Sequence, residues 1–217
     1  MRKRYLVGFA VLLAIAALTA IVRRTFYPTP LQQMQDFAAR GGTQKAAVIA
    51  GDSLVELANF SPTICGLPVI NIGQAGARAA DVLRRLNEMG DIRFAPALLV
   101  ISVGINDAIA PEHPPFAETY PEIVRRARTL AEKVFVVSPA PIANSGSVAS
   151  QVDRSRLPDV HRTIRQTAGQ YAVPMIDVSA LETRGDNPLS EDGVHLSRNG
   201  SIQWTSTIES AVGRQCP

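Results

Sequence analysis

The sequence has few of the residues that bind metals. Among 217 residues there are two cysteines, Cys65 and Cys216, and three histidines, His113, His161 and His195. The cysteines form no C-x-x-C pair, the histidines lie far apart, and no H-E-x-x-H occurs. Metal sites usually show such spacings. We therefore expect neither a metal ion nor another cofactor.

A pattern typical of nucleic-acid binding is also missing, although the formal net charge is +3. Several basic residues flank an apolar stretch near the N-terminus, namely Arg2, Lys3, Arg4, Arg23 and Arg24. Without them, acidic residues slightly outnumber basic ones. No basic stripe interleaved with aromatic residues occurs, and aromatics make up 6% of the chain. The composition thus argues against a nucleic-acid partner.

The apolar stretch Tyr5–Val22 contains no charged residue. As a helix it would span roughly 27 Å, close to the thickness of the hydrocarbon core of a membrane. We interpret residues 1–24 as a signal-anchor that crosses the inner membrane once and leaves the folded domain on the periplasmic side. The alternative is a signal peptide cleaved near Thr19-Ala20, followed by secretion. Both readings predict export.

Residues 25–43 form a linker in this interpretation. Leu31, Met34, Phe37 and Ala38 follow helical spacing, which predicts a short helix that packs on the domain. Residues 44–217 are then one domain, long enough to enclose a sizeable core.

Apolar runs alternate with amphipathic stretches along this domain. The runs are typical of buried parallel strands: Ala46–Ala50, Val69–Ile72, Leu98–Val103, Val134–Val137 and Met175–Val178. The predicted helices are Ala79–Met89, Tyr120–Lys133, Pro158–Ala172 and about Arg198 to Val212. The alternation predicts a three-layer α/β fold with a five-stranded parallel sheet. Ligands of such sheets bind at the carboxyl ends of the strands.

Two turns rich in glycine follow the first two predicted strands. Gly51-Asp52-Ser53 would place the serine at a helix N-terminus, where backbone N–H groups lack acceptors. Gly73 ends the second strand and would let its own backbone N–H approach a substrate closely. Each turn alone is also compatible with ordinary strand-to-helix connections. The pattern is not G-x-G-x-x-G, so a dinucleotide site is not indicated.

Polar residues that can take part in acyl transfer recur near the third strand and near the C-terminus. Asn106 follows the third strand and can donate a side-chain N–H to a developing oxyanion, although an ordinary Asn-Asp turn is the alternative. Asp192 and His195 lie three positions apart around a glycine. One turn can bring the carboxylate to His195 Nδ1 and leave Nε2 facing a hydroxyl group.

Taken in order, these motifs resemble the SGNH (GDSL-like) hydrolase family. The matching blocks are Gly51-Asp52-Ser53, Gly73 within Asn-x-Gly-x-x-Gly, Gly104-x-Asn106-Asp107 and Asp192-x-x-His195. The resemblance extends from about Ala46 to Trp204 and implies a flavodoxin-like fold with strand order 2-1-3-4-5.

The resemblance also implies the roles of the site residues. Ser53 would be the nucleophile, His195 the general base and Asp192 its orienting partner. The Ser53 and Gly73 N–H groups and the Asn106 side chain would form the oxyanion hole. One departure is Val55-Glu56-Leu57, which replaces the Thr-x-Gly or Ser-x-Gly often found after the first block.

The expected function is an exported serine esterase that hydrolyses small acyl esters, O-acetyl groups above all, on an envelope or extracellular carbohydrate. The alternatives are a lysophospholipase or other lipid esterase, a carbohydrate O-acyltransferase with the same triad, and a non-catalytic glycan-binding envelope subunit.

The expected topology also bears on the cysteines and on orientation. Cys65 precedes the second strand and Cys216 follows the last helix, so both should lie at the edge opposite the catalytic one. A disulfide is then possible in an oxidising compartment, and two unpaired thiols are the alternative. The linker enters from the same edge, so the active site should face away from the bilayer.

Overall fold

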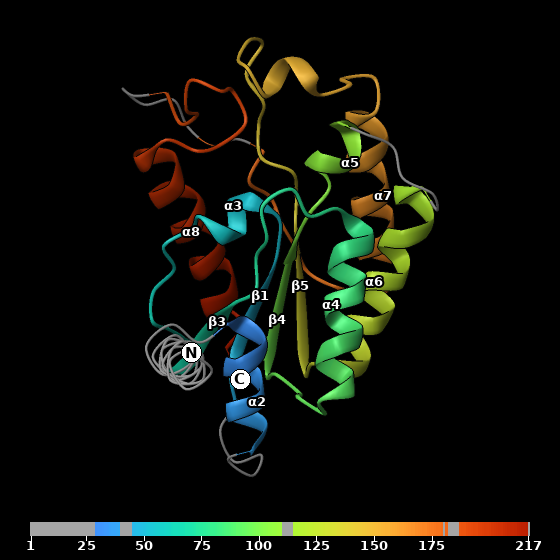
Figure 1. Cartoon of the computed structure of the whole chain (residues 1–217), viewed down its shortest axis with the longest axis vertical. Helices are drawn as coiled ribbons and strands as arrows, with labels where there is room; N and C mark the ends of the chain where they lie inside the picture. The colour runs from blue at the N-terminus through green and yellow to red at the C-terminus, as the bar shows by residue number, and fades with distance from the viewer. Residues whose placement is uncertain (1–28, 40–44, 110–114, 180, 182–186, 217) are drawn as a thin grey trace, which may run out of the picture.

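The computed structural model describes residues 29–39, 45–109, 115–179, 181 and 187–216. They form a three-layer α/β fold: Figure 1 shows a sheet with α4, α6 and α7 on one side and α3 and α8 on the other. Within these residues, no helix has both the length and the apolar character needed to cross a membrane. The predicted signal-anchor, residues 1–24, lies outside the described residues.

The sheet has six strands in the order β2-β3-β1-β4-β5-β6. Their bounds are β1 Ala47–Gly51, β2 Thr63–Ile64, β3 Leu67–Asn71, β4 Leu98–Ser102, β5 Lys133–Val137 and β6 Met175–Ile176. The five predicted strands are present, pair in parallel and follow the predicted order. The predicted strand number was wrong, because the short β2 adds an antiparallel edge beside β3.

Strand β1 lies at the centre of the sheet and leads to the site. All of its residues are buried, as expected for a parallel strand covered on both faces. Val48 and Ala50 pack toward the α4–α6 side and Ala47 and Ile49 toward α8, following the two-residue period of a strand. A Cβ on Gly51 would lie 2.1 Å from the Ser102 carbonyl oxygen. Glycine therefore permits the close approach of β4 just before the site.

The helices occur where the amphipathic stretches predict them, with shifted ends. Their bounds are α2 Pro30–Ala39, α3 Ser53–Glu56, α4 Ala79–Asp91, α5 Ile105–Ile109, α6 Phe116–Leu130, α7 Leu157–Gln170 and α8 Arg198–Gly213, with a 3₁₀ turn at Ala149–Gln151. Helix α5 was not predicted. Helix α2 confirms the short helix expected within the linker. Met34 is buried in the core, and the ring of Phe37 packs edge-on against that of Phe94 with the ring centroids 6.3 Å apart.

A disulfide joins Cys65 to Cys216, with the Cα atoms 5.6 Å apart. It connects the turn between β2 and β3 to the residues that follow α8. The possible pairing is thus confirmed, and the alternative of two unpaired thiols was wrong.

Candidate active site

Ser53 is positioned by the junction of β1 and α3. Asp52 has an extended backbone and caps α3, because its Oδ1 accepts the Leu54 N–H at 3.0 Å. Ser53 is the first residue of the helix. Its N–H therefore belongs to the first turn, where a helix supplies no acceptor of its own. This geometry makes the N–H suitable for binding an anion beside the Ser53 hydroxyl group.

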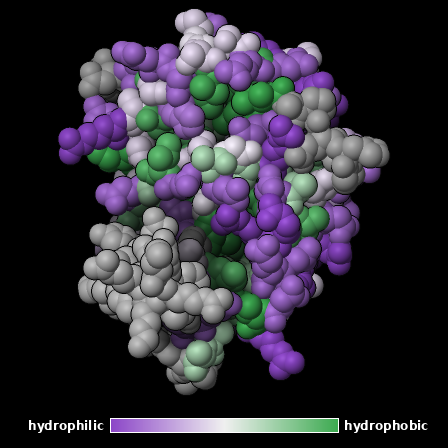
Figure 2. Space-filling model, in the orientation of Figure 1, coloured by the Kyte–Doolittle hydropathy of each residue, from purple (hydrophilic) through white to green (hydrophobic). Residues whose placement is uncertain are grey.

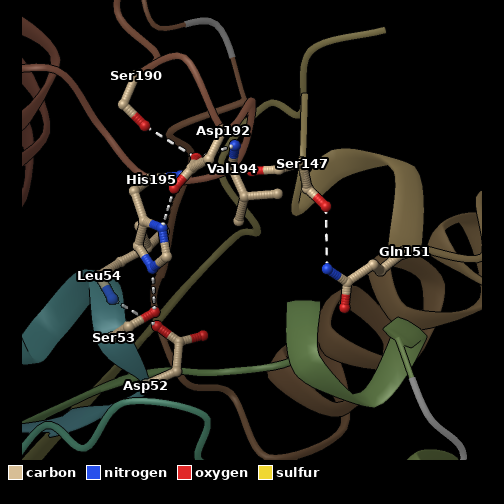
Figure 3. A network of polar contacts seen from close by, with 9 residues as sticks. All are labelled: Asp52, Ser53, Leu54, Ser147, Gln151, Ser190, Asp192, Val194 and His195. Atoms are coloured by element: carbon tan, nitrogen blue, oxygen red, sulfur yellow. Dashed lines mark hydrogen bonds and ion pairs between the residues drawn. The ribbon is translucent and has the colours of Figure 1, made fainter. Parts of the chain in front are cut away.

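His195 connects Ser53 to Asp192 (Figure 3). Its Nε2 lies 2.9 Å from Ser53 Oγ, and its Nδ1 lies 2.6 Å from Asp192 Oδ2. A carboxylate accepts hydrogen bonds only, so Nδ1 carries the hydrogen and Nε2 is left to accept the Ser53 proton. The structure thus brings together the three side chains for which the sequence predicts a catalytic triad.

Asp192 is held as an ionised carboxylate. Its Oδ1 accepts the Ser190 hydroxyl at 2.8 Å and the Val194 and His195 N–H groups, each at 2.9 Å. Partial burial favours the neutral acid. The hydrogen bonds from Val194, His195 and Ser190 outweigh it and keep the pKa of Asp192 well below its ordinary value. Asp192 can therefore orient the imidazole and balance its positive charge without accepting its proton.

The segment after β5 holds the backbone of Asp192 and Gly193, which sequence reasoning missed. The N–H groups of Val148 and Ala149 donate to the Asp192 carbonyl at 3.1 and 3.0 Å. Gly146 has a φ of +137°, and a Cβ there would lie 2.2 Å from the same carbonyl oxygen. Only glycine fits this conformation and this close approach. The sequence carries no signal for such a contact between distant loops.

The two other predicted oxyanion donors have protein acceptors in this structure. The Gly73 N–H donates to Asn71 Oδ1 at 2.8 Å, and Asn106 Nδ2 donates to the Ala77 carbonyl at 2.9 Å. The Asn106 nitrogen carries two hydrogens, so one such bond leaves the second for another acceptor. The oxyanion roles of Gly73 and Asn106 stay predictions.

The departure at Val55-Glu56-Leu57 has a structural role. The Val55 carbonyl accepts Asn71 Nδ2 at 2.6 Å, and Glu56 Oε2 accepts the Ala75 N–H at 2.6 Å. These bonds join α3 to the loop after β3. A Cβ on Gly73 would lie 2.3 Å from the Glu56 backbone nitrogen, so glycine is needed for this packing. The loop that carries Gly73 is thereby fixed against α3, next to Ser53.

Asp52 and Asp107 are buried acids beneath the site. Asp107 accepts the Ala79 N–H at 3.2 Å and so anchors the start of α4. Burial, followed by the negative charge of Asp107, raises the pKa of Asp52 to about 7, although the Leu54 N–H and His195 oppose the shift. Asp52 therefore costs the fold stability when it is ionised.

Replacing Asp52 by asparagine is expected to stabilise the protein at pH 8 and to change little near pH 4. The native state holds a proton between the ordinary pKa of 3.8 and about 7 that the unfolded state releases. Wild-type stability therefore falls as pH rises through this window, whereas Asp52→Asn lacks the loss and keeps a capping oxygen. The difference at pH 8 should reach a few kcal/mol, at about 1.4 kcal/mol per pKa unit.

Urea unfolding at pH 4, 6 and 8 measures this difference. Asp36→Asn, at an exposed position of α2, is the matched control and should follow wild type at every pH. If the free energies of unfolding of Asp52→Asn and wild type differed by the same amount at all three pH values, burial would not shift the pKa of Asp52.

No cluster of histidine, cysteine, aspartate or glutamate suited to a metal ion occurs among the described residues. His113 lies outside them.

Comparisons with known proteins agree with this fold. The model of the GDSL-like Lipase/Acylhydrolase family matches residues 39–201. No curated protein matches the chain in sequence. Among solved structures, a putative acylhydrolase from Bacteroides fragilis has 21% identity and a TM-score of 0.66, covering 86% of this chain and 97% of its own.

Two further structures share the fold. A lipase/acylhydrolase from Enterococcus faecalis has 21% identity and a TM-score of 0.64, covering 79% of this chain and 97% of its own. A catalytic mutant of an acetylxylan esterase from Geobacillus stearothermophilus has 17% identity and a TM-score of 0.61, covering 79% of this chain and 95% of its own. The family match spans most of the chain and includes the Ser53 and His195 blocks. The chain therefore belongs to the GDSL-like lipase/acylhydrolase family and is a carboxylic ester hydrolase.

Proposed function

We propose that this protein is an exported serine esterase that removes small acyl groups, O-acetyl groups above all, from an envelope or extracellular carbohydrate. The observation that carries the proposal is the continuous hydrogen-bonded chain from Ser53 through His195 to Asp192. A serine hydroxyl is a weak nucleophile until such a base accepts its proton.

In the first step, Ser53 Oγ attacks the ester carbonyl carbon while His195 Nε2 takes the hydroxyl proton. The Ser53 N–H and the second Asn106 hydrogen stabilise the oxyanion. The Gly73 N–H joins them when the oxyanion shares or replaces its bond to Asn71. Collapse of the intermediate breaks the bond to the leaving alcohol, which receives the proton from Nε2.

In the second step, water attacks the acyl-enzyme and gives a proton to His195. Collapse then releases the carboxylic acid and returns that proton to Ser53. The negative charge of Asp192 stabilises the imidazolium that forms in both steps.

Export is supported by two independent features. The apolar segment Tyr5–Val22 with its basic flanks is typical of a signal-anchor or a signal peptide. The Cys65–Cys216 disulfide suits an oxidising compartment such as the periplasm. We propose that residues 1–24 anchor the domain in the inner membrane.

A carbohydrate is favoured over a membrane lipid by the position of α2. Helix α2 lies at the end of the molecule opposite the carboxyl edge of the strands, where α3 and Ser53 begin (Figure 1). The chain passes from α2 into the opposite end of β1, so a domain anchored through its N-terminal segment would turn Ser53 away from the bilayer. The Geobacillus relative of this fold is an acetylxylan esterase, which acts on an acetylated carbohydrate.

The test is a series of p-nitrophenyl esters with acyl chains from C2 to C12, together with acetylated xylan and a lysophospholipid. We expect kcat/KM to be highest for acetate, and acetate to be released from the polysaccharide. Preference for C8 or longer chains would contradict the small-acyl proposal and favour a lipid esterase. Labelling of Ser53 by a fluorophosphonate without turnover of any ester would indicate an acyltransferase that needs a sugar acceptor.

A further inference from the structure

A groove lies beside the triad, between α3 and the start of α8. This α3–α8 groove encloses about 370 Å³, and its walls include Leu54, Leu57, His195, Leu196, Arg198 and Ile202. Most of the exposed lining is apolar, and Asn59, Ser197 and Ser201 add polar groups to it. Figure 2 shows hydrophobic surface among hydrophilic residues in the upper half of the face that carries α3 and the start of α8.

Two side chains of the groove are unusually exposed for their type. Leu57 is 68% and Ile202 is 56% exposed, whereas most large apolar residues of the described chain are buried. Scattered exposed apolar residues need no explanation. Here the two residues come from different helical segments, yet they line one groove together with His195.

Leu57 is also the last residue of Val55-Glu56-Leu57, the segment that departs from the family pattern after the Ser53 block. It stands where the family pattern often has glycine, at the end of α3. Glu56, beside it, holds the loop after β3 through the Ala75 N–H. Leu57 makes no comparable structural contribution, because its side chain reaches into solvent at the groove.

The chemistry of the proposed function determines which part of an ester can enter this groove. The carbonyl oxygen must face the oxyanion donors, which come from the Ser53 N–H and the segments after β3 and β4. The leaving oxygen must lie at His195 Nε2 to receive its proton. The rest of the alcohol continues past His195, and His195 forms a wall of the α3–α8 groove.

We infer that the α3–α8 groove is the subsite for the alcohol part of the ester, and that Leu57 and Ile202 select alcohols that present an apolar face. This inference rests on the proposed function and adds a specificity site to it. Exposed apolar walls gain from contact with an apolar ligand surface, and one methylene in such a pocket can change kcat/KM by about tenfold.

The experiment uses acetate esters that share one acyl group and differ in the alcohol: methyl, butyl, hexyl and benzyl acetate. The proteins are wild type, Leu57→Ala, Ile202→Ala and the double variant. Leu31→Ala is the matched control, because Leu31 is 38% exposed on α2, away from the groove. Exposed substitutions of this kind seldom affect folding.

We expect the double variant to lower the ratio of kcat/KM for hexyl over methyl acetate by about tenfold. The ratio for p-nitrophenyl butyrate over acetate should stay constant, since those esters share an alcohol. Leu31→Ala should change neither ratio.

The contradicting outcomes are distinct. An unchanged alcohol ratio beside normal, Ser53-dependent turnover would overturn the subsite and leave the esterase proposal standing. A change in the butyrate ratio alone would assign the groove to the acyl group, which also overturns the inference. Absence of Ser53-dependent turnover of every acetate would overturn the esterase proposal and the subsite together.

Discussion

Ser53→Ala is expected to lower kcat for p-nitrophenyl acetate by at least about 10⁴-fold while the fold is retained. Alanine removes only Oγ, so β1, α3 and the capping bond from Leu54 to Asp52 should persist. The reaction then lacks the atom that forms the acyl-enzyme. His195 and Asp192 cannot replace it, because His195 only accepts the Ser53 proton and Asp192 only orients His195.

The measurement is steady-state turnover beside circular dichroism and thermal unfolding. Ser206→Ala, at an exposed position of α8, is the matched control and should be as active as wild type. Equal activity of Ser53→Ala and wild type would refute the nucleophile assignment. Loss of activity accompanied by loss of the fold would call for Ser53→Gly or Ser53→Cys as the variant to compare.

Removal of the disulfide is expected to be the largest single effect on stability. Cys65 and Cys216 are separated by 151 positions, so the bond closes a very long loop in the unfolded chain. Chain-entropy estimates for such loops give about 3–5 kcal/mol. The bond also fixes the end of α8 to the β2–β3 turn, and α8 follows directly on the His195 loop.

Urea unfolding of wild type with and without reductant, and of Cys65→Ser/Cys216→Ser, measures this contribution. Reduced wild type and the double variant should unfold at the same, lower urea concentration, and reductant should leave the double variant unchanged. Identical midpoints for oxidised and reduced wild type would contradict a stabilising role.

Sequence reasoning identified the sheet because its strands are short, continuous apolar runs. The fully buried β1 and β4 are of this kind, and parallel strands covered on both faces require such composition. It missed β2, whose two residues are too short for any periodicity. The structure shows a hairpin there, because Cys65 and Gly66 between β2 and β3 have φ values of 55° and 72°, as a tight hairpin turn requires.

The meeting of Ser53, Asp192 and His195 could be expected from sequence, because each residue lies in a short motif at a strand or loop end. The contacts that hold these residues in place could not be expected. Ser190 bonds to Asp192 locally, but the contact of Gly146 with the Asp192 carbonyl joins loops far apart in the chain. Such contacts depend on packing between segments whose sequences carry no shared pattern.

The departure Val55-Glu56-Leu57 illustrates the same limit. The sequence marks it as different from the family pattern, and only the structure assigns Glu56 to the loop after β3 and Leu57 to the α3–α8 groove. Residues that leave a family pattern are therefore natural places to look for specificity.

The most direct test of the account is covalent labelling with a fluorophosphonate, followed by mass spectrometry of the peptides. Reagents of this kind react with serine hydroxyls that a neighbouring base activates. We predict a single modification on Ser53, absent from Ser53→Ala and strongly slowed in His195→Ala. Labelling at another serine, or an unmodified Ser53 in the folded protein, would contradict the activation of Ser53 by His195.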